Sequence, residues 1–255
     1  MNSVRRILVT GGARRVGRRL VQRLSQAGHA VIIHANTNKA DADELCAELR
    51  KTNPHTWSMV ADLSDHAAAC ALIGQAGQLA GGTLSGLVNN ASVFDYDDPA
   101  AMNLAVFDKA MAVNLRAPAL LSEAFFRQAS PERDNCIVNM LDMKLWSMNP
   151  DFYSYTMSKA GLLAATDMMA RSFAPTVRVN AIAPGLLLPS YDQTPEEFRA
   201  AASKNLLGRE IDLDDVASAL EFLLATPSLT GQVIHVDNGQ RLISARRDVI
   251  FEPRK

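Results

Sequence analysis

The stretch RRILVTGGARRVGRRL, residues 5–20, decides the fold of this chain. Its apolar run Arg6–Thr10 predicts a buried strand, which leads through a glycine turn into a helical pattern over Val16–Ala27. A strand, a glycine turn and a helix start bring unpaired backbone N–H groups and the positive end of a helix dipole to one point. The stretch therefore predicts a phosphate-binding turn, although a plain tight turn would share the pattern.

Short apolar runs and helical patterns alternate along the rest of the chain. The further strand candidates are Ala30–His34, Thr56–Val60, Gly86–Val88, Cys136–Met140, Arg178–Ile182 and Val233–Val236. The further helix candidates are Ala40–Lys51, Ala67–Leu79, Leu104–Gln128, Tyr153–Phe173 and Leu213–Ala225. Strands separated by helices imply right-handed crossovers, so we expect an α/β, doubly wound sheet covered by helices on both faces. We expect a single domain over residues 1–255, with a substrate loop and a short helix at about 185–209.

Composition excludes several classes of protein. A chain of 255 residues with 48% apolar residues can bury one sizeable core, and its net charge of −1 gives no reason to expect nucleic acid or an anionic membrane as partner. No apolar run approaches a membrane span and no signal peptide is visible, so we expect a cytoplasmic protein. Cys46, Cys70 and Cys136 lack metal-ligand spacing, so we expect reduced thiols and no metal site.

The end of the second strand candidate indicates which dinucleotide the turn would bind. It reads His34-Ala35-Asn36-Thr37-Asn38, without the Asp or Glu that usually binds the ribose 2′-hydroxyl of NAD. The donors available to a 2′-phosphate are Arg14 or Arg15, His34, Asn36 and Thr37. NADPH/NADP+ is therefore favoured, although exposed loop polarity would also explain these residues. Asp62 and Leu63 follow the third strand and are placed to meet the adenine.

Tyr155 and Lys159 form a candidate proton-transfer pair. Residues at i and i+4 share one face of a helix, so the ammonium can lie beside the phenol and lower its pKa. Asp142, thirteen residues before Tyr155, adds a carboxyl group that could meet a substrate. Such pairs occur by chance on many helices, so the pair alone is weak evidence.

Taken together, these pieces resemble the short-chain dehydrogenase/reductase family over nearly the whole chain. The matching motifs, in order, are Thr10–Gly17, Asp62-Leu63, Asn89-Asn90-Ala91, Asn114, Tyr155/Lys159, Arg178-Val179-Asn180 and Pro184-Gly185. The resemblance implies a Rossmann-type fold of seven parallel strands, a nicotinamide cofactor and usually a homotetramer. It also implies that Tyr155 is the acid, that Lys159 holds the nicotinamide ribose and tunes Tyr155, and that Asn114 supports a water relay. Without the family, Asn114 would be interpreted as a helix-kink or capping residue.

By the same resemblance, the cofactor would contact further residues of these motifs. They are Gly11, Val16, Gly17, Asn90, Ala91, Ser92, Pro184, Gly185 and Leu186. At Leu186 the chain lacks the threonine or serine with which many family members bind the carboxamide, so backbone groups would serve there.

Two departures from the family pattern indicate which class of substrate the site would accept. Arg15 occupies the position of the middle glycine of the turn, and Asp142 that of the usual serine. An ionised carboxylate cannot donate to a carbonyl oxygen and would repel an oxyanion, whereas a protonated one can deliver a proton to a ring nitrogen. The site is therefore expected to act on a C=N bond rather than a ketone, unless Asp142 is incidental in a degenerate site.

Both departures resemble the pteridine reductases, including the bacterial dihydromonapterin reductases. The similar segments are Gly11–Gly17, Asn89–Phe94, Asn139–Asp142 and Tyr155–Lys159. The resemblance implies that Phe94 and the nicotinamide sandwich the heterocycle, that Arg15 contacts cofactor phosphate and substrate, and that Ser92 bonds to both ligands. Phe152 could also line the pocket, or pack under a loop.

The expected function is NADPH-dependent reduction of a dihydropteridine or pterin of the dihydromonapterin, dihydrobiopterin or dihydrofolate type. One alternative is a carbonyl or 3-oxoacyl reductase, and another is a non-catalytic dinucleotide sensor. The tail from Arg241 to Lys255 is expected to be a solvated or interface-packing end.

Overall fold

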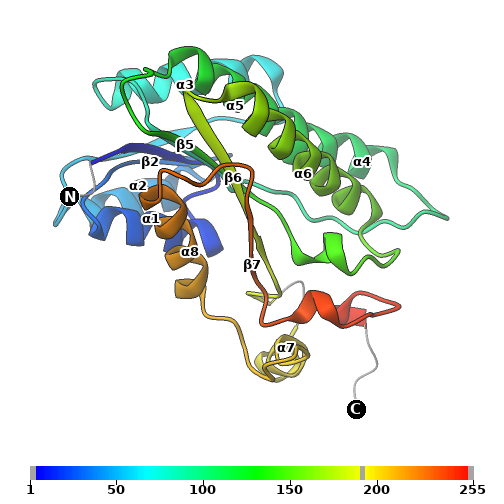
Figure 1. The fold of residues 1–255 in the computed structure, drawn as a ribbon. Helices are drawn as coiled ribbons and strands as arrows, with labels where there is room; N and C mark the ends of the chain where they lie inside the picture. The colour runs from blue at the N-terminus through cyan, green and yellow to red at the C-terminus, as the bar shows by residue number, and fades with distance from the viewer. Residues whose placement is uncertain (1–3, 190–192, 252–255) are drawn as a thin grey trace.

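The computed structural model describes residues 4–189 and 193–251, which form one seven-stranded parallel sheet (Figure 1). Its strand order is β3-β2-β1-β4-β5-β6-β7, and every neighbouring pair is parallel. The strands are β1 (Arg6–Val9), β2 (Ala30–Ala35), β3 (Thr56–Val60), β4 (Gly86–Asn89), β5 (Asn135–Met140), β6 (Val177–Pro184) and β7 (Val233–Val236). The predicted α/β fold is confirmed, with strand ends shifted by at most two residues.

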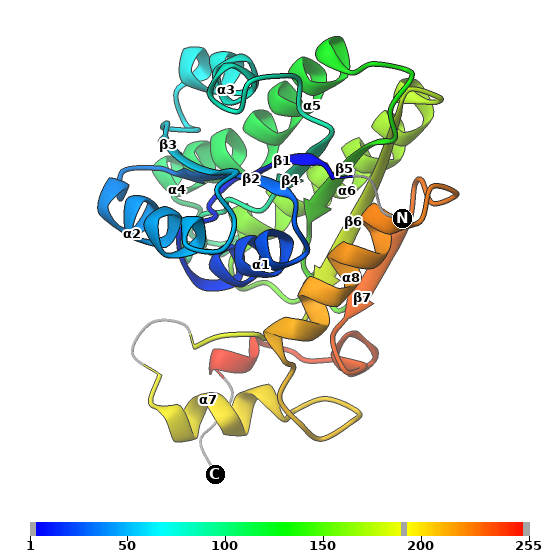
Figure 2. The same ribbon diagram turned by 90° about the vertical axis from the view of Figure 1, so that its left-hand side faces the viewer.

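Successive residues of each strand point to opposite faces of the sheet, and a helical layer covers each face. Ile7 and Val9 pack toward α1 (Arg15–Gln26), α2 (Lys39–Arg50) and α8 (Leu213–Ala225). Leu8 packs toward α3 (His66–Leu79) and α5 (Ala117–Gln128), and α6 (Tyr153–Phe173) lies beside α5 in the same layer (Figures 1 and 2). All three of these β1 side chains are fully buried, which explains the continuous apolar run in the sequence.

The helix predicted over Leu104–Gln128 is present, but it is not α-helical throughout. The structure has α4 (Leu104–Ala110), a π-helical segment (Met111–Arg116) and then α5. Pro118 has no amide to donate to the carbonyl of Asn114, four residues earlier, so regular α-helical bonding cannot run unbroken through this stretch. Wider π-helical turns often mark functional sites, and this one contains Asn114.

Beyond the carboxyl ends of β6 and β7 lies a smaller region made of α7 (Pro195–Ala202) and the end of the chain (Figure 2). The predicted loop and short helix at 185–209 are thus confirmed for the described residues, while positions 190–192 lie outside them. Three short 3₁₀ turns complete this side, at Met143–Trp146, Gln240–Leu242 and Val249–Phe251.

None of the helices in residues 4–189 and 193–251 combines the length and apolar content of a membrane-crossing segment. No group of three or more His, Cys, Asp or Glu side chains in those residues is arranged to hold a metal ion.

At the amino-terminal edge of the sheet, Asp134 pairs with two buried arginines. Arg178 Nε donates to Asp134 Oδ1 at 2.8 Å, and Arg5 also pairs with this carboxylate. Near the end of α8, Arg5 donates to the Leu224 carbonyl at 2.8 Å and Arg178 donates to the Leu223 carbonyl at 2.9 Å. Burial opposes ionisation of Asp134, but the two guanidinium groups outweigh it and hold its pKa below the usual value.

We expect Asp134→Asn to lower the free energy of unfolding by about 2 kcal/mol at neutral pH, because two buried guanidinium groups lose their anionic partner. The folded-state pKa of Asp134 is depressed, so its stabilisation is complete above the unfolded-state pKa and is lost as the pH falls through the folded-state pKa. Urea unfolding of both proteins at neutral and progressively acidic pH measures this. A difference that stays constant into acid would contradict the assignment.

Candidate active site

A cavity of about 670 Å³ opens at the carboxyl edge of the sheet, beside the neighbouring strands β1 and β4. The chain order reverses there, because β1 is followed by β2 on one side and β4 by β5 on the other. In open α/β sheets this switch point is where ligands bind. Many of the predicted site residues line the cavity together: Gly11, Arg14, Arg15, Val16, Gly17, Asn90, Ala91, Ser92, Phe94, Asp142, Tyr155, Gly185 and Leu186.

The glycine turn is tightly built at the start of α1. Gly11 has a φ of +61°, and a Cβ on Gly17 would lie 2.1 Å from the Gly11 carbonyl oxygen. Arg15 also has a positive φ, +51°, at the position where the resemblance places a glycine. The turn therefore keeps its glycine-like backbone although an arginine occupies this position.

The first turn of α1 is suited to an anion. Within the described residues no side chain caps this helix, whereas Asp65 caps α3 and Asp212 caps α8. Its first amides and the positive end of its dipole consequently face the cavity without a carboxylate. This uncapped turn fits the phosphate group that the sequence predicts.

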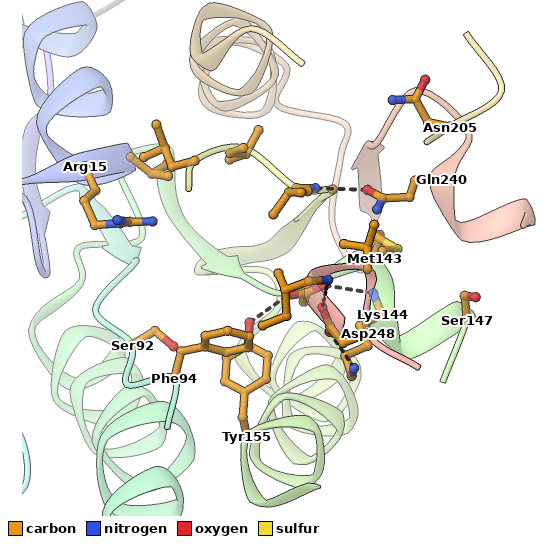
Figure 3. A pocket seen from close by; sticks show the side chains of 18 of the residues that line it. Arg15, Ser92, Phe94, Met143, Lys144, Ser147, Tyr155, Asn205, Gln240 and Asp248 are labelled. Carbon is orange, nitrogen blue, oxygen red and sulfur yellow. Dashed lines mark hydrogen bonds and ion pairs between the residues drawn. The ribbon is translucent and has the colours of Figure 1, made fainter. Parts of the chain in front are cut away.

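Arg14 and Arg15 extend from the turn in different directions. Arg14 forms an ion pair with Asp41 near the start of α2, close to the end of β2, where Asn36 and Thr37 are exposed. Arg15 Nη2 donates to the Pro189 carbonyl at 3.1 Å and thus spans the cavity toward the 185–189 loop. Figure 3 shows the Arg15 side chain above the cavity, opposite Phe94.

His34 is not a phosphate ligand, contrary to the sequence-based prediction. The ring is 1% exposed, its Nδ1 accepts from the Gly11 amide at 3.2 Å, and its Nε2 donates to the Ala61 carbonyl at 2.9 Å. Burial lowers the pKa of His34, so the imidazole is neutral and holds the glycine turn through its hydrogen bond with the Gly11 amide.

The other residues expected at the adenosine end do not line the cavity. Ala35 and Leu63 have buried side chains, so only their backbone could face a ligand. Asp62 is exposed and accepts from the amide and hydroxyl of Ser64 at 2.8 and 2.7 Å, hydrogen bonds that lower its pKa. Pro184, the last residue of β6, brings Gly185 and Leu186 to the cavity wall.

Tyr155 and Asp142 meet at the centre of the cavity. The Tyr155 hydroxyl donates to Asp142 Oδ2 at 2.7 Å (Figure 3). Burial, followed by the negative charge of Asp142, raises the pKa of Tyr155 well above its usual value. The prediction that Lys159 lowers this pKa was therefore wrong: the Lys159 ammonium donates to the Met140 carbonyl at 2.7 Å and lies 5.8 Å from the tyrosine ring centroid. Tyr155 stays a neutral proton donor.

Asp142 also has an environment that favours its neutral form. It is half-buried at the start of a 3₁₀ turn, where its Oδ1 accepts from the Lys144 amide at 2.8 Å. Enclosure by protein is the main cause of its raised pKa, and the hydrogen bonds from Lys144 and Tyr155 only partly oppose it. Lys159, fully enclosed behind this pair, has its pKa lowered by burial to about 8.

Asn114 fixes the segment that contains Ser92 and Phe94. Its Oδ1 accepts from the amide of Val93 at 2.8 Å and the hydroxyl of Ser92 at 3.2 Å. Its Nδ2 donates to the Val93 carbonyl and the Ser158 hydroxyl, each at 3.0 Å. All four bonding positions of the side chain are used, so the predicted water relay could involve only the Asn114 backbone.

Phe94 faces the cavity with a second aromatic ring behind it. It stacks on Phe152 with centroids 3.9 Å apart and meets Tyr155 edge-on at 4.7 Å. Phe152 is fully buried and does not line the cavity, so its predicted contact with substrate is replaced by support of Phe94. The residue is held in the left-handed region, with a φ of +55°, immediately before α6.

One side of the cavity is formed by residues that the sequence did not indicate: Ile243, Ala245, Arg247, Asp248, Val249 and Ile250 near the chain end, with Met143, Lys144, Ser147, Asn149 and Gln240. The substrate loop predicted at about 185–209 contributes Leu187, Leu188, Lys204 and Asn205. The prediction of a solvated or interface-packing tail was thus wrong for 243–250. The charged pair Arg247-Asp248 is the only hint in the sequence, and nothing local to it identifies its partners.

Comparisons with known proteins agree with this architecture. The family model described as "Enoyl-(Acyl carrier protein) reductase" matches residues 11–241. The short chain dehydrogenase/reductase dpchG of Colletotrichum higginsianum is 32% identical over 249 residues, covering 91% of this chain and 92% of that protein. The 3-oxoacyl-[acyl-carrier-protein] reductase FabG of Staphylococcus aureus is 26% identical, covering 94% and 99%.

Two solved structures match the whole arrangement of strands and helices. FolM alternative dihydrofolate reductase 1 from Brucella canis, complexed with NADP, has a TM-score of 0.88 and 36% identity, covering 93% of this chain and 94% of that one. The protein of the same name from Brucella suis, also in complex with NADP, has a TM-score of 0.87 and 35% identity, covering 93% and 95%.

We expect Asn114→Ala to lower the free energy of unfolding by about 2–3 kcal/mol, because the buried amide and carbonyl of Val93 lose their partner. Asn103→Ala is the matched control, since Asn103 only caps the exposed start of α4 and its loss costs about 1 kcal/mol. Urea unfolding measures both. Equal losses in the two variants would show that Asn114 does not hold the 92–94 segment.

Proposed function

Because the chain belongs to the short-chain dehydrogenase/reductase family, we propose that it is an NADPH-dependent reductase acting on a C=N bond of a dihydropteridine or pterin. The observation that supports this most is the hydrogen bond of 2.7 Å from Tyr155 to Asp142, beside Phe94, which lines the cavity. A carboxyl group with a raised pKa lies where a ketone reductase needs a donor to the carbonyl oxygen.

The residues of the cavity fit a dinucleotide with a 2′-phosphate. The uncapped first turn of α1 would bind the pyrophosphate, and Arg14, with Asn36 and Thr37 after β2, would bind the 2′-phosphate. The absence of an acidic residue at 34–38 removes the repulsion that an NAD-type site would exert. Lys159, enclosed next to Tyr155, would bind the nicotinamide ribose. The cofactor, when bound, supplies the hydride.

Phe94 and the Asp142–Tyr155 pair supply the rest of the reaction. The flat ring of Phe94, fixed by Phe152 behind it, would stack on the heterocycle. As a ring carbon takes the hydride, the neighbouring ring nitrogen takes a proton from the Tyr155 hydroxyl, or from Asp142 through water. Burial raises the pKa of both groups and so favours their proton-bearing forms.

Reduction of a ketone is the second candidate. The Staphylococcus aureus relative is named as a 3-oxoacyl-[acyl-carrier-protein] reductase, and the family model has an acyl-carrier name. Asp142 accepts hydrogen bonds from the Tyr155 hydroxyl and the Lys144 amide, so it takes the place of the serine donor that a ketone oxygen would use, which is why we rank ketone reduction below the pteridine. A sensor without catalysis ranks last, because Asn114, Tyr155 and Lys159 are all present. A cytoplasmic homotetramer stays a proposal from the family resemblance.

The proposed function predicts NADPH oxidation with a dihydropteridine and little with ketones. The measurement follows the nicotinamide absorbance with dihydromonapterin, dihydrobiopterin, dihydrofolate and a panel of ketones, and repeats the active pair with NADH. Turnover only on ketones would overturn the pteridine assignment, and cofactor binding without any turnover would favour the sensor. Tyr155→Phe serves as the control: turnover should fall by about 10²–10⁴-fold while NADPH affinity is largely kept.

We expect kcat/KM for a dihydropteridine to fall as the pH rises through the raised pKa of Asp142, because the proton-bearing form is then lost. Asp142→Asn should lower the rate and remove this decline. Both proteins are measured with the same substrate over the same pH range, so titration of the substrate itself cancels. A decline that persists unchanged in Asp142→Asn would show that Asp142 is not the titrating group.

A further inference from the structure

The last described residues of the chain, 243–251, form a C-terminal strap along one side of the cavity (Figure 3). Arg247 Nε donates to both carboxylate oxygens of Asp151 at 3.0 and 2.8 Å. The Asp248 amide donates to Asp151 Oδ2 at 2.7 Å, and the Asp151 side chain is only 2% exposed. At the start of the strap, the Ser147 hydroxyl donates to the Ile243 carbonyl at 2.8 Å.

The strap is also joined to the aromatic support of Phe94. Phe251 stacks against Phe152 with centroids 5.8 Å apart, and Tyr96 meets both rings edge-on, at 5.2 Å from Phe251 and 5.4 Å from Phe152. The strap thus contacts the 147–152 segment, which lies between Asp142 and Tyr155 in the sequence. Its place beside the cavity is fixed by ion pairs and by ring packing at once.

Asp248 is the charged group that the strap brings to the cavity. Its side chain is 15% exposed and pairs with the Lys144 ammonium at 2.8 Å. The amide of the same Lys144 donates to Asp142 Oδ1, so a single residue connects Asp248 to the reacting pair. The charge of Asp248 adds to the effect of burial in raising the pKa of Asp142, and to the larger effects of burial and Asp142 in raising that of Tyr155.

Asp248 has no part in the proposed proton transfer from Tyr155 or Asp142. Its carboxylate can also accept more hydrogen bonds than it does. A carboxylate can accept about four hydrogen bonds. Within the described residues, its Oδ2 accepts from Lys144, and its Oδ1 accepts from the Ile250 amide at a long 3.3 Å. Acceptor positions therefore remain at a site that lines the cavity next to Asp142.

We propose that Asp248 is a substrate-binding residue that accepts hydrogen bonds from N–H or O–H donors of the heterocycle or its side chain. Val249 and Ile250, which line the cavity beside it, form the apolar wall next to this contact. The strap then selects substrates that carry such donors and disfavours anionic substituents, because Asp142 and Asp248 are both acidic. This inference rests on the proposed pteridine reductase function.

Two matched substrate pairs test this contact: a dihydropteridine with and without its 2-amino group, and one with and without side-chain hydroxyls. In Asp248→Asn a charge-assisted hydrogen bond to the substrate is lost. We therefore expect kcat/KM to fall about tenfold for the substrate that carries the donor, and much less for the matched substrate that lacks it. The KM for NADPH should not change. A structural defect would instead lower both members of a pair equally.

Two further variants keep the test decisive. Arg246→Gln, on an exposed strap residue that does not line the cavity, should leave both ratios unchanged. The double variant Lys144→Met/Asp248→Leu removes the ion pair without leaving a buried charge and should abolish the same discrimination. Thermal unfolding and NADPH binding confirm that each variant is folded.

The outcomes separate this inference from the function on which it rests. Loss of discrimination in either substrate pair supports the contact and identifies the donor. Unchanged discrimination in both pairs, with the wild type active on pteridines, overturns the role of Asp248 alone. A wild-type enzyme that neither binds nor reduces any pteridine, measured by calorimetry of the NADP+ complex and by turnover, overturns both proposals.

Discussion

The hydrogen bond between the Tyr155 hydroxyl and Asp142 organises the chemistry of this protein. It places a phenol and a carboxyl group in an enclosed site, where the charged form of either is disfavoured. Burial raises the pKa of both groups, while the Lys159 ammonium donates to the Met140 carbonyl. The proposed preference for a substrate nitrogen over a carbonyl oxygen rests on this contact.

Several distant parts of the chain are needed to hold that contact in place. The end of β5 supplies Asp142, and α6 supplies Tyr155 one helical turn before Lys159. The amides at the start of α6 donate to Asp97, at its backbone carbonyl and its carboxylate, and the π-helical Asn114 holds the segment of Phe94. The strap at 243–251 closes the remaining side through Lys144 and Asp151.

The comparisons establish the family and the fold, whereas the substrate is proposed from the chemistry of the site. Membership of the family and the matched solved structures account for the sheet, the glycine turn and the oxidoreductase class. Relatives named as ketoreductases share that scaffold, so the scaffold alone does not choose a substrate. The choice rests on Asp142, Phe94 and the groups around them, which is where the proposed function and the proposed role of Asp248 are argued.

The sequence by itself determined what depends on local patterns. Buried parallel strands require continuous apolar runs, a phosphate turn requires glycines between strand and helix, and the Tyr155/Lys159 pair requires only helical spacing. The identity of residue 142 is the basis in the sequence for the proposed C=N substrate.

Tertiary structure alone decided which groups became neighbours and how far each was removed from water. It enclosed His34 beneath the glycine turn, raised the pKa of Tyr155, placed Phe152 behind Phe94, introduced a π-helical segment into the 104–128 helix and brought residues from 243–250 to the cavity. These outcomes depend on distances between residues far apart in the chain, because burial and charge act through space and not along the sequence.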